Sequence, residues 1–214
     1  MVMAKYPIFL ELSGQHVVVI GGGKVAFRKA KVLLETGARV VVVARKAGET
    51  MEALCAGSNI RLVKDSYAKE YLVGAVLAIA ATDDMALNQQ IHKDCQELEV
   101  LCNVVDEPAL CDFYVPAVVQ RGALQIAIGT GGQSPAFAGH LRKKLERIIT
   151  AEHGEFLEEL ERLRKRIQAE IGDINERKSL AGELVDDKSF ERFVESGAAE
   201  WRRWANELVR SRKQ

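Results

Sequence analysis

The first half of the chain alternates short apolar runs with segments of helical periodicity. The apolar, β-branched runs predict five strands, at His16–Ile20, Arg39–Ala44, Ile60–Val63, Ala75–Ala80 and Val100–Asn103. Residues 40–43 are four valines, so both faces of that strand are apolar, as in a parallel sheet covered by helices on both sides. Between strands, helical spacing predicts helices at Lys24–Glu35 and Asp84–Leu98, the second with Thr82 or Asp83 as its N-cap. This alternation predicts an α/β fold of the Rossmann type.

The pattern changes beyond residue 113. Two strands, Tyr114–Val119 and Leu124–Ile128, flank a turn at residues 120–122, and a helix at Ala136–Ile149 follows the start signals Ser134 and Pro135. Charged side chains make up 33 of the 75 residues from 140 to 214, and apolar stripes there indicate further helices. We expect a Rossmann domain at 1–113, a small α+β region at 114–149 and a helical domain at 150–214.

Composition narrows the range of functions. The 30 basic and 30 acidic side chains cancel, so no overall positive field favours nucleic acid. The longest apolar runs are far shorter than the ~18 residues of a membrane span, and no signal peptide is apparent. The four cysteines form no C-x-x-C pair and the four histidines have no metal-ligand spacing, so we expect reduced thiols, a cytoplasmic location and no resident metal.

A glycine motif follows the first predicted strand. Gly21, Gly22 and Gly23 precede Lys24 and Val25, and with Ala26 they fit the G-x-G-x-x-[GA] pattern of dinucleotide-binding turns. Phosphates would meet the free N–H groups at the start of the helix. The alternative is a turn that only packs a helix against a strand. A Walker loop is excluded because Val25, and not Ser or Thr, follows Lys24.

The second predicted strand ends without the carboxylate that usually binds the ribose 2′-hydroxyl of NAD. Arg45 and Lys46 occupy that place, and an arginine there suits the 2′-phosphate of NADP. Taken alone, the residues at this strand end therefore favour NADP over NAD.

Polar side chains also follow the fourth and fifth strands, at the sheet edge where Rossmann folds bind ligands. Thr82 and Asp83 follow the fourth strand, Asn103 ends the fifth, and Asp106 comes three residues later. Asp106 is the candidate acid/base, although an Asp before Glu107 and Pro108 can equally cap the turn. A helix start that can bind an anion follows Thr130, Gly131, Gly132 and Ser134, and Arg121 is a further candidate contact. Further along that helix, Arg142, Lys143, Lys144 and Arg147 add positive charge, for which a solvated face is the alternative.

Together these motifs resemble the precorrin-2 dehydrogenase/sirohydrochlorin ferrochelatase family, which includes the N-terminal module of siroheme synthases. The resemblance runs over roughly residues 4–150. It is carried by Tyr6–Leu12, Gly21–Lys29, Ala80–Asp84, Asn103–Asp106, Asp112–Phe113 and Gly129–Pro135, with Thr130 where many members have serine.

The resemblance implies NAD-dependent oxidation of precorrin-2 to sirohydrochlorin, followed in some members by insertion of Fe²⁺ as a substrate. It also implies a homodimer with 114–149 as dimerisation region. Asp106 matches the family's catalytic acidic residue, and Lys24, Val25, Arg45 and Lys46 match its cofactor contacts. Here the resemblance overrules the NADP preference. An NAD(H)-sensing regulatory dimer is the alternative function, because one fold hosts many functions.

Overall fold

The computed structural model describes residues 5–212, which fall into two compact units that divide between Val115 and Pro116. Residues 1–4 and 213–214, which belong to the predicted first and third domains, lie outside the described part. The three-part division remains a prediction.

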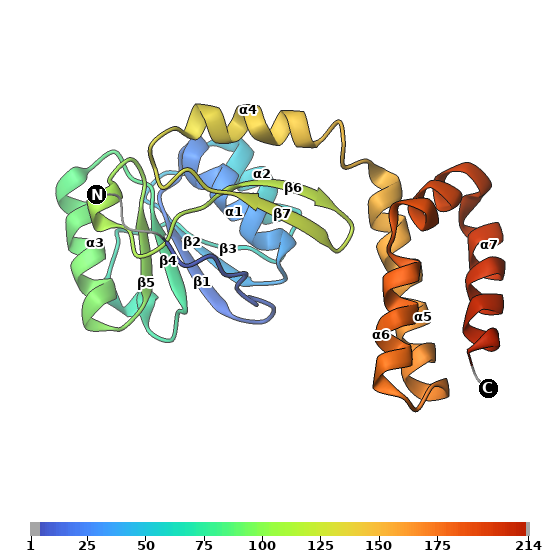
Figure 1. Ribbon diagram of the computed structural model, residues 1–214. Helices are drawn as coiled ribbons and strands as arrows, with labels where there is room; N and C mark the ends of the chain where they lie inside the picture. The colour runs from blue at the N-terminus through green and yellow to red at the C-terminus, as the bar shows by residue number, and fades with distance from the viewer. Residues whose placement is uncertain (1–4, 213–214) are drawn as a thin grey trace. The chain divides into compact units, whose positions relative to one another are not determined.

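Unit one is a five-stranded parallel sheet with helices on both faces (Figure 1). The strand order is β3-β2-β1-β4-β5, that of a Rossmann fold. In chain order the elements are β1 His16–Ile20, α1 Lys24–Glu35, β2 Arg39–Val43, α2 Glu49–Ala56, β3 Arg61–Val63, the 3₁₀ helix η1 Lys69–Leu72, β4 Leu77–Ala80, α3 Met85–Glu97, β5 Leu101–Val104 and the 3₁₀ helix η2 Pro108–Leu110.

Two apolar cores lie on the opposite faces of this sheet. One contains Ala26, Ala30 and Leu33 of α1 with Met51 of α2, and the other contains Ile91 and Cys95 of α3. The central strand β1 supplies Val17 and Val19 to the first core and Val18 and Ile20 to the second, because successive side chains of a strand point to opposite faces. The apolar runs on both faces of the strands are thereby explained.

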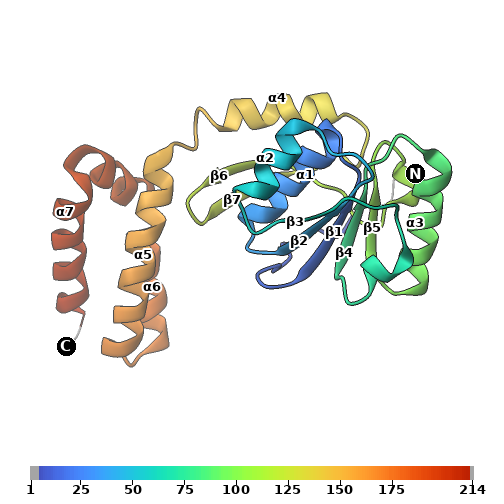
Figure 2. The ribbon, with the colours of Figure 1, turned by 180° about the vertical axis from the view of Figure 1, so that it is seen from behind.

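Unit two begins with the antiparallel pair β6 Ala117–Arg121 and β7 Leu124–Ile128 and continues through α4 Pro135–Leu145, α5 Ala151–Glu170, α6 Ile174–Leu184 and α7 Asp187–Ser211. Within it, α5, α6 and α7 pack side by side (Figure 2). Phe156, Leu163, Phe193 and Trp201 form their apolar core. Gly197 breaks α7 with φ +79°, outside the helical region.

The predicted fold class is confirmed in its parallel sheet, small α+β segment and C-terminal helices. The helix expected at 136–149 ends earlier, at Leu145 of α4, and three further local differences follow. β6 runs from Ala117 to Arg121, not from 114 to 119, because Gly122 at φ +55° closes a two-residue hairpin loop and leaves Arg121 paired with Leu124. The helix α2 was not predicted, since it is only eight residues long and buries little beyond Met51.

The third error concerns the start of α3. Its N-cap is Asp84, neither Thr82 nor Asp83. The Asp84 backbone is extended and its carboxylate accepts a hydrogen bond from the Leu87 N–H at 3.1 Å. The Thr82 hydroxyl bonds to Asn88 instead, at 2.7 Å, which leaves the capping position to Asp84.

Candidate functional site

The glycine turn connects β1 to α1 at the carboxyl edge of the sheet. Gly21 has φ +131°, a conformation that favours glycine, and a β-carbon there would overlap the carbonyl oxygen of Ala81, which follows β4. The third position of the motif is Ala26, fully buried against the sheet. The first and third small residues therefore bring β1, β4 and α1 close together.

Gly22 and Gly23 differ in what surrounds them. A β-carbon on Gly22 would overlap the carbonyl oxygen of Lys46, and the Gly22 carbonyl accepts from the Gly48 N–H at 3.0 Å. A β-carbon on Gly23 would have no atom within 4 Å. Gly22 thus serves the packing of the loop after β2, whereas Gly23 leaves open space before α1.

The start of α1 is suited to an anion. Gly23 is its N-cap and gives no side-chain hydrogen bond, and the first turn has no acidic residue. Its first N–H groups are therefore available, and the helix dipole adds positive potential. The open side of Gly23 would let a pyrophosphate approach these groups, so the residues fit a dinucleotide. Lys24 is exposed beside them, and Val25 is half-buried.

Arg45 and Lys46 are exposed and follow β2 after one buried residue, Ala44. The hydrogen bond between Gly48 and Gly22 holds their loop against the glycine turn. The structure thus brings these two predicted cofactor residues together with Gly21–Val25.

Thr82 and Asp83 follow β4, next to Ala81. The Thr82 hydroxyl bonds to the Asn88 side-chain oxygen, and the Asn88 amide returns a bond to the Thr82 carbonyl at 3.0 Å. Asn88 is buried and was missed in the sequence, where only its helical position six residues after Thr82 could have indicated it. Asp83 is exposed.

Asn103 lies buried within β5, and its amide donates to the Phe113 carbonyl at 2.9 Å. Asp112 accepts from the Cys102 N–H at 2.8 Å and returns its own N–H to the Cys102 carbonyl. These bonds tie the segment at 111–113 to β5. They give Asn103 a role in holding this edge of the sheet, whereas its place near the cofactor stays a prediction.

Asp106 lies in the turn after β5. The turn is closed by the Glu107 N–H on the Val104 carbonyl at 3.3 Å, and Asp106 itself has φ +64°, unusual for a residue other than glycine. Across residues 5–212 its exposed carboxylate has no hydrogen bond and no ion pair, so the turn-capping alternative finds no bond to support it.

The predicted anion-binding segment belongs to unit two. The Thr130 hydroxyl accepts from the Ser134 N–H at 3.3 Å, Gly131 and Gly132 both have positive φ, and Ser134 caps α4 through the Phe137 N–H. Arg121 is partly engaged elsewhere, because its guanidinium donates to the Glu146 carbonyl at 3.1 Å, just past the end of α4.

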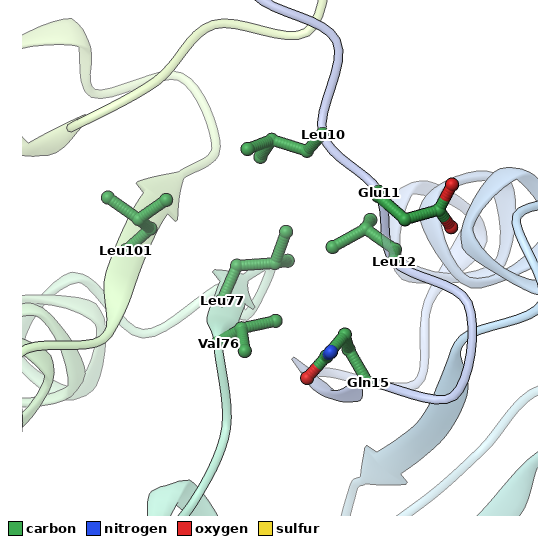
Figure 3. A pocket seen from close by; sticks show the side chains of 7 residues that line it. All are labelled: Leu10, Glu11, Leu12, Gln15, Val76, Leu77 and Leu101. Carbon is green, nitrogen blue, oxygen red and sulfur yellow. The ribbon is translucent and has the colours of Figure 1, made fainter.

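A separate hollow of about 250 Å³ lies at the opposite edge of the sheet (Figure 3). Leu77 and Leu101 begin β4 and β5 there, and Leu10, Leu12 and Val76 complete its apolar wall. The Glu11 carboxylate points away from it (Figure 3). Because the glycine turn and Asp106 follow the carboxyl ends of their strands, this hollow is distinct from the candidate site.

Two features are absent from the described residues. No group of three or more His, Cys, Asp or Glu side chains is placed to hold a metal ion in this part of the chain. Among its helices, none combines the length and the apolar character needed to cross a membrane.

Comparison with known proteins gives two family matches. Residues 8–117 match the family model described as "Putative NAD(P)-binding", and residues 121–148 match "Sirohaem biosynthesis protein central". The first match covers just over half of the chain.

Curated relatives include siroheme synthases of Pseudomonas putida strain W619, 37% identical over 203 residues, and of Psychrobacter cryohalolentis, 36% identical over 186 residues. The alignments cover 95% and 87% of this chain but only 44% and 36% of those proteins. The chain thus spans well under half the length of these relatives.

The solved structure titled "SirC, precorrin-2 dehydrogenase" has the same fold. It matches 97% of this chain and all of that chain with a TM-score of 0.80 at 24% sequence identity. The resemblance in the sequence motifs is thereby confirmed, and the chain belongs to the NAD(P)-binding family whose model covers its parallel-sheet unit.

Proposed function

We propose that the protein oxidises precorrin-2 to sirohydrochlorin with NAD⁺, as a step of siroheme synthesis. The observation that carries the proposal is the arrangement at the carboxyl edge of one sheet: an uncapped helix start behind an open glycine follows β1, and the turn after β5 presents a carboxylate with no partner among residues 5–212. The relatives add support through their names, since they are siroheme synthases and the structural neighbour is titled a precorrin-2 dehydrogenase.

The cofactor-binding residues in this proposal are those of the glycine turn and the adjoining strand ends. The N–H groups at Gly23–Val25 hold the pyrophosphate, while Arg45 and Lys46 lie by the adenosine ribose. Thr82, Asp83 and Asn103 border the cofactor from β4 and β5. NAD⁺, when bound, accepts a hydride from the substrate.

Asp106 is the proposed base. Oxidation removes a hydride and a proton from the tetrapyrrole, and the hydride leaves its carbon with the bonding electron pair. The proton is taken by the Asp106 carboxylate, which is exposed and has no competing hydrogen bond within residues 5–212. Precorrin-2 carries many carboxylates, for which Thr130, Gly131, Gly132, Ser134 and Arg121 are the proposed contacts.

The finer parts of the proposal extend the resemblance. We include a homodimer formed through 114–149, a cytoplasmic location and, as a second reaction, insertion of Fe²⁺ into sirohydrochlorin with Asp106 assisting removal of the pyrrole protons. The Cys55, Cys95, Cys102 and Cys111 thiols are free, which accords with a reducing compartment.

The test is an anaerobic assay of the purified chain with precorrin-2 and NAD⁺, following NADH and the oxidised tetrapyrrole by absorbance. NADP⁺ in place of NAD⁺ is the matched comparison, and we expect the lower rate with it. Added Fe²⁺ then tests chelation. Binding of NAD⁺ without turnover would overturn the dehydrogenase and support the sensor instead.

A further inference from the structure

Five polar or charged side chains are buried in the described part of the chain, and they differ in how completely they are hydrogen-bonded. They are Asn88, Asp94, Asn103, Glu159 and Ser189. A buried polar atom has lost its bonds to water, so in folded proteins it nearly always has another partner. A buried oxygen without a partner therefore requires an explanation.

Four of the five are satisfied by the fold. Thr82 pairs with both ends of the Asn88 amide, at 2.7 and 3.0 Å. Arg202 donates to both oxygens of Glu159, at 2.8 and 2.5 Å. The partners of the other two are Tyr67 and Gln90 for Asp94, and Leu184 and Trp201 for Ser189.

Asn103 in β5 is the exception. Its Nδ2 donates to the Phe113 carbonyl at 2.9 Å and to the Cys111 Sγ at 3.4 Å. From residues 5–212 its Oδ1 accepts no hydrogen bond. Because a carbonyl oxygen can only accept, the contact with Phe113 requires the N–H₂ group on that side. This contact fixes the orientation of the amide and leaves the oxygen on its other side.

The unpaired oxygen of Asn103 is open to solvent. Among the side-chain nitrogens and oxygens of the described residues, only His92 Nδ1 is both enclosed and without a partner. The Asn103 Oδ1 is therefore accessible, although its side chain is only 8% exposed. An acceptor held in this way suits a ligand that offers an N–H or O–H donor, and it disfavours an anion.

Asn103 lies three residues before Asp106, in the carboxyl half of β5. In the strand order β3-β2-β1-β4-β5, the loop with Arg45 and Lys46 lies on one side of β1, and β4 and β5 lie on the other. Neighbouring strands are ~4.8 Å apart, so β5 is about 10 Å from β1. A dinucleotide with its pyrophosphate at the glycine turn and its adenosine by Arg45 therefore extends its nicotinamide half across β4 towards β5.

We propose that the Asn103 Oδ1 accepts a hydrogen bond from the carboxamide N–H of the nicotinamide ring and thereby orients the ring beside Asp106. The inference rests on the proposed function. The carboxamide carries the N–H donors next to the reacting ring, and it supplies the partner that residues 5–212 do not give this oxygen. Because the Phe113 carbonyl holds the Asn103 amide in one orientation, the carboxamide is held in one orientation too.

The first test measures binding and needs no turnover. Calorimetric titration compares NAD⁺ with 3-acetylpyridine adenine dinucleotide, in which a methyl group replaces the carboxamide nitrogen. The wild type should bind NAD⁺ about tenfold more tightly, because the analogue leaves the Asn103 oxygen unpaired. In Asn103→Ala this preference should disappear, while ADP-ribose, which lacks the nicotinamide, should keep its affinity. Equal affinity of the wild type for the two dinucleotides would overturn the inference.

Two further variants separate this role from a structural one. Asn103→Asp loses the N–H bond to Phe113, as Asn103→Ala does, but it keeps an oxygen for the carboxamide. Both should lower Tm, whereas only Asn103→Ala should lose the preference for NAD⁺. Asn88→Ala removes a buried amide whose two ends are already paired, so it should lower Tm and keep the preference. Loss of the preference in all three variants would show that it follows stability, which contradicts the inference.

Turnover distinguishes a failure of this inference from a failure of the proposed function. A wild type that prefers NAD⁺ in binding but does not oxidise precorrin-2 contradicts the proposed function only. An active wild type whose preference for NAD⁺ survives in Asn103→Ala contradicts the inference only.

Discussion

The carbonyl oxygen of Ala81 occupies the space that a β-carbon on Gly21 would need. Neither group can move easily, since Gly21 is bonded to Val43 and Ala81 to Ile20 through their backbone N–H groups at 2.9 and 2.8 Å. The contact therefore links β1, β2 and β4 at the edge of the sheet where the candidate site lies.

Gly21→Ala should destabilise the protein by about 2–4 kcal/mol, because it combines backbone overlap with a positive φ. Gly23→Ala is the matched control, since its β-carbon meets open space. We expect it to keep the free energy of unfolding while weakening NAD⁺ affinity. Urea unfolding and calorimetric titration measure the two effects. Equal losses of stability in both variants would contradict this assignment.

Asp106→Asn should lower kcat by about 10²- to 10⁴-fold, the usual contribution of a general base. Asparagine tolerates the positive φ of this position and keeps the side-chain shape, so the fold and NAD⁺ binding should survive. The measurement is the anaerobic rate together with a binding titration. A variant as active as the wild type would remove Asp106 from the mechanism.

Gly154→Ala should destabilise unit two by about 1–3 kcal/mol. A β-carbon there would lie 2.6 Å from the Arg121 carbonyl oxygen, where α5 passes over β6. Gly182→Ala in α6 meets no atom within 4 Å and should stabilise by about 0.5–1 kcal/mol, as alanine favours a helix. Thermal unfolding of the two variants should shift Tm in opposite directions.

Arg202→Met should destabilise the helical core by about 1–2 kcal/mol at neutral pH. Glu159 is buried in α5, and its carboxylate accepts two bonds from Arg202 at 2.8 and 2.5 Å. About half of the Arg202 side chain is exposed, so solvent screening keeps the effect below the 3–5 kcal/mol of a fully buried pair.

The same pair predicts a pH dependence. The Arg202 guanidinium holds the Glu159 pKa below its usual value, so the stabilisation is present above that value and lost as the pH falls through the lowered one. Unfolding of the wild type and Arg202→Met should therefore converge in acid. A constant difference down to the acid limb would show that the pair is not the cause.

The sequence predicted accurately those elements whose ends are set by residues close by in the chain. β1 and α1 match their predicted bounds to the residue, because a run of glycines separates them and apolar periodicity changes there from two to 3.6. β6 was misplaced, since its end depends on its pairing with β7. Pairing is a tertiary property that neither strand carries alone.

The candidate site also contains some residues that the sequence predicts and others that only the fold reveals. The glycine motif and the strand ends could be located from residue type and order, as in Gly21, Thr82 and Asp106. Asn88 was missed, because its hydrogen bonds to Thr82 form only in the folded chain. The need for glycine at position 22 was also hidden, since it arises from a carbonyl 24 residues further along the chain.

The close approach of Gly22 to the 46–48 loop constrains how cofactor preference can change. The backbone of that loop is fixed by its contact and hydrogen bond with the glycine turn. Insertions or deletions there would distort the proposed pyrophosphate cradle together with the proposed ribose contacts. On that proposal, exchange between NAD and NADP proceeds by replacing the exposed side chains of Arg45 and Lys46 on an unaltered main chain.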